Sequence, residues 1–208
     1  MMSERKSSHS IEYRIQASIR GRGRGCVVVP ADFLEIGSRQ AVDLALHRLT
    51  QKGIIRRLAR GVYDFPKKHP VLGTLAPSAE KVAAALAIRD HTRIQPAGAY
   101  AANVLGLSDQ VPAKAVFLTN GPTRTVKICS TSIQLRRTTA RNMAATGRLS
   151  GLLIQALRAI GKEHVTKQHR VHLKHALPAR QRRELLKDLT LAPAWMHPIF
   201  RELAGRNP

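Results

Sequence analysis

Three side chains at the start of one amphipathic segment have the chemistry to read a base edge. Ser38, Arg39 and Gln40 stand at the beginning of a predicted helix over residues 39–52. Serine is a strong N-cap residue, and arginine and glutamine can each form paired hydrogen bonds, to guanine and to adenine respectively. This segment is therefore the first place to expect contact with a nucleic acid.

The elements around that helix set its position. The sequence predicts a helix, a short strand, a brief helix, the capped helix and a basic hairpin, over residues 11–20, 26–29, 31–35, 39–52 and 54–65. This order is the plan of a winged helix-turn-helix, in which the third helix enters the DNA major groove. The alternative is a helix with an ordinary solvated face beside an ordinary edge hairpin.

In the winged-helix interpretation, the hairpin arginines grip phosphates or enter the minor groove. The glycine-rich turn after residue 20 either touches the DNA backbone through its arginines or is a passive turn. Asp43 is unfavourable near phosphates unless it accepts from a cytosine amine or pairs with Arg39 or His47. The predicted DNA contacts are Ser38, Arg39, Gln40, Asp43, His47, Arg48, Arg56, Arg57, Arg60, Arg22 and Arg24.

The overall charge favours a polyanionic partner. The 208 residues include 35 Lys and Arg against 13 Asp and Glu, a net charge of +22. No apolar run approaches the ~18 residues of a membrane span, and the first ten residues lack the apolar core of a signal peptide. Two cysteines cannot form a disulfide scaffold, so we expect a cytoplasmic protein that does not bind membranes.

The titratable residues do not favour catalysis. The acidic residues are scattered rather than clustered as two-metal enzymes need, so we expect no catalytic residue, cofactor or metal. His164, His169, His172 and His175 crowd one segment, and the last three could approach one helical face. Zinc needs a defined tetrahedral set, so we favour a polar helix face over a metal site.

The length of the chain and a proline-containing break predict two domains. Residues 65–70 contain two prolines and no periodicity, so we expect a linker there, between a winged helix-turn-helix over residues 1–70 and a second domain over 71–208. The second domain mixes predicted helices with strands near 115–119, 125–128 and 132–136, which gives an α+β class overall.

A second basic surface is expected within the second domain. Residues 122–187 hold 15 basic and 2 acidic residues. The candidates for this surface are Arg136, Arg137, Arg141, Arg170, Lys174, Arg180, Arg182 and Arg183. They would extend DNA contact, bind RNA or simply be solvated.

The first domain resembles the N-terminal domain of AbiEi-type antitoxins. The resemblance rests on residues 32–34, 37–42, 45–49 and 52–63, and above all on the Arg57-x-x-Arg60-Gly61-x-Tyr63 pattern. Residues 77–80 and 98–107 are similar to that family's second domain, though less distinctively. The resemblance implies a bacterial type IV antitoxin that represses its own promoter. It also implies a second domain that opposes a nucleotidyltransferase-like toxin encoded alongside, without needing a stable complex with it.

We therefore expect an antitoxin and autorepressor whose first domain binds an inverted-repeat operator in double-stranded DNA. Contact with about six phosphates would give a slope of about −5 for log affinity against log salt. The alternatives are a ligand-sensing transcription regulator, an RNA-binding protein, or a nucleic-acid-processing enzyme that uses the basic second domain.

Overall fold

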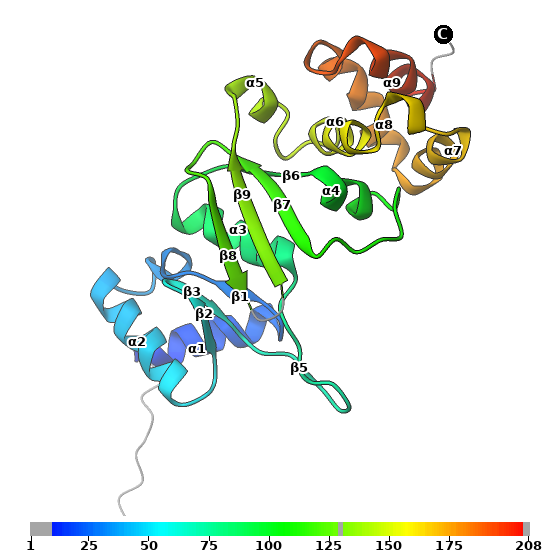
Figure 1. Ribbon diagram of the computed structural model, residues 1–208. Coiled ribbons are helices and arrows are strands. Elements are labelled where there is room, and N and C mark those ends of the chain that lie inside the picture. Colours follow the sequence, from blue (N-terminus) through cyan, green and yellow to red (C-terminus); the bar gives the residue numbers. More distant parts are fainter. Residues whose placement is uncertain (1–9, 129–130, 206–208) are drawn as a thin grey trace, which may run out of the picture. The chain divides into compact units, whose positions relative to one another are not determined.

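The computed structural model describes residues 10–128 and 131–205 (Figure 1). It combines helices with three small sheets, so the predicted α+β class is confirmed. The described chain divides into two compact units, residues 10–92 with Ile128 and residues 93–127 with 131–205. None of the helices in these ranges is long and apolar enough to cross a membrane.

Unit 1 follows the predicted element order as far as residue 64. Its elements are α1 (Ile11–Arg22), β1 (Val27–Val28), η1 (Pro30–Phe33), α2 (Arg39–Gln51), β2 (Arg56–Ala59), β3 (Val62–Asp64), β4 (Lys68–His69), β5 (Gly73–Thr74) and α3 (Ala79–Arg89). Most of the predicted ends are shifted by one or two residues. The brief helix expected over 31–35 is the single 3-10 turn η1.

Helix α2 is held by an apolar stripe on one face. The hydroxyl of Ser10 caps α1 by accepting from the Tyr13 amide, and α1 then packs its buried Ile15 and Ile19 into the core shared with α2. The stripe predicted for α2 is buried there: Val42, Ala45, Leu46 and Leu49. The antiparallel sheet of order β1-β3-β2 completes this core, which leaves the opposite face of α2 to solvent.

The expected linker over residues 65–70 is instead ordered backbone. Phe65 continues the sheet, since its amide donates to the Cys26 carbonyl (3.0 Å) and its carbonyl accepts from the Gly25 amide (2.6 Å). Pro66 and Pro70 mark the entry and the turn of the β4–β5 hairpin, because proline favours turns as much as linkers. Helix α3 then packs on η1, β1 and β3, so the compact units divide after Thr92 rather than near residue 70.

Unit 2 combines a four-stranded sheet with a helical layer. Its elements are β6 (Ile94–Ala97), α4 (Gly98–Val104), β7 (Lys114–Thr119), β8 (Arg124–Ile128), β9 (Thr131–Arg137), α5 (Ala140–Met143), α6 (Leu149–Ile160), η2 (Lys162–His164), α7 (Lys167–Ala176), α8 (Ala179–Glu184), η3 (Leu185–Leu191), η4 (Ala194–Met196) and α9 (His197–Leu203). The strand order is β6-β7-β9-β8, with β6 antiparallel and β9 parallel to β7. Strand β6 was not predicted, and its Pro96 is tolerated because β6 is an edge strand.

The helices of unit 2 are held together by a shared apolar core and by one polar cluster. Leu153, Leu157 and Phe200 are fully buried in the core that α4, α6, α7 and α9 share. At the start of α6 the buried Asp188 carboxylate accepts from the Ser150 hydroxyl and from the Arg148 guanidinium. All groups of this cluster therefore have partners, and it joins α6 to η3.

Candidate nucleic-acid interface

The solvent face of α2 presents one stripe of side chains. The Ser38 hydroxyl accepts from the Ala41 amide (3.4 Å), so the predicted N-cap is confirmed. Gln40, Leu44, His47 and Gln51 are exposed at i, i+4, i+7 and i+11, which places them on one side of the helix. Because the other side of α2 is buried, the helix that carries this stripe is fixed in unit 1.

Leu44 is a member of the stripe that the sequence analysis missed. Its side chain is 49% exposed, although it lies in a helix whose other leucines are buried. An exposed apolar side chain among polar ones can contact a thymine methyl group. The available signal was its place outside the apolar stripe, next to Asp43 on the polar side.

Arg39 and Asp43 form a surface ion pair. Arg39 Nε donates to Asp43 Oδ2 at 2.9 Å, one turn along α2. This pairing was one of the arrangements in which Asp43 could be tolerated near phosphates. Both side chains are about half exposed, and such pairs contribute about 0.3–0.5 kcal/mol. Arg39 can therefore exchange Asp43 for another acceptor at little cost.

The β2–β3 hairpin presents two arginines to solvent. Arg57 and Arg60 are exposed and make no ion pair with any acid in the part of the chain that the structure describes. The turn between the strands is fixed from outside, since Arg89 Nη1 donates to the Arg60 carbonyl at 2.6 Å. Burial lowers the pKa of Arg89, and its guanidinium is also held by Asp90 at 2.8 and 3.1 Å. Arg89 is thus a positioning residue for the hairpin turn, and no local pattern indicated a partner 29 residues away.

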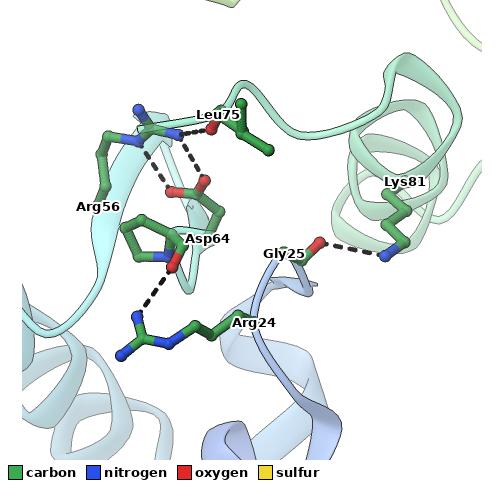
Figure 2. Close-up of polar contacts among 7 residues, drawn as sticks. Arg24, Gly25, Arg56, Asp64, Leu75 and Lys81 are labelled. Carbon is green, nitrogen blue, oxygen red and sulfur yellow. Dashed lines mark hydrogen bonds and ion pairs between the residues drawn. The ribbon is translucent and has the colours of Figure 1, made fainter. Parts of the chain in front are cut away.

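Arg56 does not belong to the exposed set, contrary to expectation. Its guanidinium donates to both carboxylate oxygens of Asp64, at 3.0 and 2.7 Å, and to the Leu75 carbonyl at 3.2 Å (Figure 2). The Asp64 side chain is only 1% exposed. The reason is strand geometry: Arg56 lies directly opposite Asp64 in the β2–β3 register, so the carboxylate draws it inward.

The two arginines of the glycine-rich turn are also engaged within unit 1. Arg22 lies 3.4 Å from the Asp32 carboxylate and its guanidinium stacks over the Phe33 ring at 5.3 Å. Arg24 donates to the Pro66 carbonyl at 3.1 Å and stacks over the Phe65 ring at 4.8 Å. These contacts close the turn onto the sheet, and both arginine side chains remain exposed, so their predicted contact with phosphates stays a prediction.

A small basic cavity of about 180 Å³ lies beside these contacts. Arg24, Lys67, Ser78 and Lys81 contribute to its lining, and the buried Asp64 lies at one side. Lys81 Nζ donates to the Gly25 carbonyl at 3.2 Å, so it ties the start of α3 to the glycine-rich turn (Figure 2). The cavity walls are therefore cross-linked by the same side chains that give it positive charge.

The predicted second basic surface is spread over several elements of unit 2. Arg136 and Arg137 end β9, Arg141 is on α5, Arg170 and Lys174 are on α7, and Arg180, Arg182 and Arg183 are on α8. Arg170 pairs with Glu202 (3.2 Å) and Arg182 donates to the Leu203 carbonyl (3.2 Å), so both bind α9. The other six are exposed.

The four histidines have separate roles. His169 Nδ1 accepts from the Thr166 amide (3.3 Å) at the start of α7, and His172 Nε2 lies 3.0 Å from the Leu105 carbonyl. His164 and His175 are exposed. Among residues 10–128 and 131–205, no three or more His, Cys, Asp or Glu side chains are grouped as metal ligands.

Fold and surface together define an α+β protein whose first unit presents a capped helix and a basic hairpin. The chain belongs to a family described as a family of unknown function, DUF6088, whose profile matches residues 14–185. The crystal structure of the RV2827C protein from Mycobacterium tuberculosis is similar, with a TM-score of 0.45 and 17% sequence identity over 94% of this chain and 76% of that chain. No curated protein matches the sequence.

Proposed function

We propose that unit 1 binds double-stranded DNA as a winged helix-turn-helix, with α2 in the major groove and the β2–β3 hairpin as the wing. The observation that carries this proposal is the exposed stripe of α2, beginning at the N-cap, next to a hairpin with two outward arginines. Gln40 and Arg39 would read base edges, while Arg57 and Arg60 would neutralise phosphates.

The resemblance to AbiEi-type antitoxins extends the proposal to a biological role. The protein would act in the cytoplasm, repress its own promoter at an inverted repeat and, through unit 2, counteract a nucleotidyltransferase-like toxin. A charge of +22 supports a polyanionic partner for the whole chain.

A gel-shift titration tests the DNA half of the proposal. The probes are the duplex immediately upstream of the gene and a scrambled duplex of equal composition, each at several salt concentrations. Among residues 10–92, six exposed cations neither pair with an acid nor donate to a carbonyl group: Arg20, Arg48, Arg57, Arg60, Lys67 and Lys68. Neutralising about six phosphates gives a slope of about −5 for log affinity against log salt. A slope near zero, or equal affinity for both probes, contradicts operator binding by this surface.

Two substitutions separate base reading from phosphate contact. Gln40→Ala should reduce the preference for the upstream duplex over the scrambled one, because a paired base contact supplies ~1–3 kcal/mol of discrimination. Arg60→Ala should weaken both probes alike and make the salt slope shallower by about one. Arg201→Ala, at an exposed arginine of α9, is the matched control. If Gln40→Ala weakens both probes equally, α2 is not the recognition helix.

Co-expression tests the antitoxin half. The reading frame next to this gene should encode a nucleotidyltransferase-like protein whose expression arrests growth, and the full chain should restore growth. Growth rescue that survives Gln40→Ala would assign antitoxicity to a surface other than the DNA-reading one. An adjacent frame without this toxicity contradicts the antitoxin role and leaves a DNA-binding regulator. Preference for RNA over duplex DNA in competition would overturn the DNA proposal itself.

A further inference from the structure

The β4–β5 hairpin is an ordered arm with an apolar tip. Its strands pair Lys68 with Thr74 and His69 with Gly73, and the Leu75 amide closes the base on the Lys67 carbonyl at 2.8 Å. We refer to residues 67–75 as the arm. Figure 1 shows it extending away from the rest of unit 1 near the β5 label.

The tip of the arm is fully presented to solvent. Val71 is 86% exposed and Leu72 is 71% exposed. The tip backbone is nevertheless fixed, because His69 Nδ1 accepts from the amides of both Val71 and Leu72, each at 3.2 Å. The backbone that carries these two large apolar side chains is therefore fixed, and both side chains are left open to solvent.

The base of the arm is anchored to the proposed wing. Arg56 holds the Leu75 carbonyl with the same guanidinium that binds the buried Asp64, so one residue joins the arm to β2 and β3 (Figure 2). The base of the arm is therefore attached to the β2–β3 hairpin, so a duplex bound by that hairpin lies close to the arm.

The charge of the arm indicates which kind of partner its tip would contact. Lys67 and Lys68 precede the tip at the start of the arm, and residues 65–79 contain no acid. The area that Val71 and Leu72 could bury is far below the ~800 Å² per partner of a stable protein interface. Two apolar side chains are also too few to anchor a protein in a bilayer. Short apolar wedges beside cationic side chains are what proteins insert at base steps from the DNA minor groove.

We propose that the arm enters the minor groove of the duplex bound by unit 1, with Val71 and Leu72 against a base step and Lys67 and Lys68 on the flanking phosphates. This inference rests on the proposed DNA binding and adds a second contact that neither α2 nor the β2–β3 hairpin supplies.

The test uses the full chain and the upstream duplex of about 30 bp, or three helical turns. The variants are Val71→Ser with Leu72→Ser, and separately Lys67→Ala with Lys68→Ala. Val111→Ser is the matched control, because Val111 is 84% exposed in unit 2. Each is measured by fluorescence anisotropy across salt, and on a series of duplexes with 2-aminopurine placed at successive adenines, which brightens when a base step unstacks.

The serine pair should weaken binding about tenfold with an unchanged salt slope, since it removes apolar contact and no charge. The lysine pair should make the slope shallower by about 1.8, or 0.9 per phosphate. The wild type should brighten one or two adjacent 2-aminopurine positions, and the serine pair should abolish that signal while Val111→Ser preserves it.

The failures of the two proposals are distinguishable. If the serine pair binds like Val111→Ser, or if no 2-aminopurine position brightens, the arm does not insert, while base discrimination lost in Gln40→Ala would still support DNA binding by α2. If the wild type does not bind the duplex, both proposals fall. Loss of self-association or of binding to anionic phosphatidylserine vesicles in the serine pair, with unchanged duplex affinity, would assign the arm to a second copy or to a membrane and overturn the inference.

Discussion

Replacing Arg56 with alanine should destabilise unit 1, whereas replacing its neighbour Arg57 should not. Arg56 supplies two hydrogen bonds to Asp64 and a third to the Leu75 carbonyl. Removing it leaves a carboxylate that is only 1% exposed without its charged partner. Breaking a buried pair in this way costs ~3–5 kcal/mol.

The structure places the expected loss at the lower end of that range. About a third of the Arg56 side chain is exposed, so water can enter the space that alanine leaves and solvate part of the Asp64 charge. We therefore expect the free energy of unfolding to fall by about 3 kcal/mol, which is about a 160-fold loss of hydrogen-exchange protection in β2 and β3. Arg57→Ala should stay within about 0.5 kcal/mol of the wild type.

Hydrogen exchange followed by mass spectrometry is the suitable assay, because it reports unit 1 separately from unit 2. The double variant Arg56→Ala with Asp64→Ala should regain protection relative to Arg56→Ala, since the unpaired buried charge is gone. The reasoning is refuted if Arg56→Ala is as protected as Arg57→Ala and loses DNA affinity to the same degree. Arg56 would then be the phosphate contact that the sequence suggested.

Two further predictions concern packing and pH. Gly151→Ala should destabilise the protein by about 3 kcal/mol in thermal unfolding, because the added Cβ would overlap the Ala145 carbonyl oxygen. Gly21→Ala in α1 is the control. Its added Cβ meets no atom within 4 Å, so it should be neutral or stabilising by about 0.5 kcal/mol. Burial raises the pKa of the Cys26 thiol, so in a Cys129→Ser background its alkylation should be slower in the folded than in the urea-unfolded chain at pH 8. The same shift favours the protonated folded state, so its stabilisation should be full below the unfolded thiol pKa and lost as pH rises through the folded value. Equal alkylation rates in the two states, or a stability that rises over that alkaline range, would contradict the assignment.

Local patterns predicted the elements of unit 1 well and their connections less well. The stripe from Val42 to Leu49 and the Ser38 cap are properties of a single helix, so spacing alone located α2. The β4–β5 hairpin and strand β6 escaped because each is short, and their prolines are typical of loops. Strand β6 also depends on its pairing with β7, such as Ile94 with Thr119, which a local pattern does not contain.

The roles of individual arginines could not be predicted for a related reason. Arg56 and Arg57 are adjacent and chemically identical, yet one faces Asp64 across the β2–β3 ladder and the other faces solvent. Arg89 shows no local feature that marks it as support for a turn 29 residues earlier. A sequence shows that arginines are present, whereas the acid or carbonyl each one meets is a property of the fold.

The acids and carbonyl groups of unit 1 therefore decide which basic side chains are left to contact phosphates. Five of its Lys and Arg residues pair with acids: Lys52 with Glu12, Arg22 with Asp32, Arg39 with Asp43, Arg56 with Asp64 and Arg89 with Asp90. Three more donate to carbonyl groups, namely Arg14, Arg24 and Lys81. Residues 10–92 contain 14 Lys and Arg, so uniform contact would give a salt slope of about −13. The six that remain lie on α1, α2 and the two hairpins, and they correspond to about −5. A measured slope thus distinguishes a defined surface on these elements from a diffuse basic field.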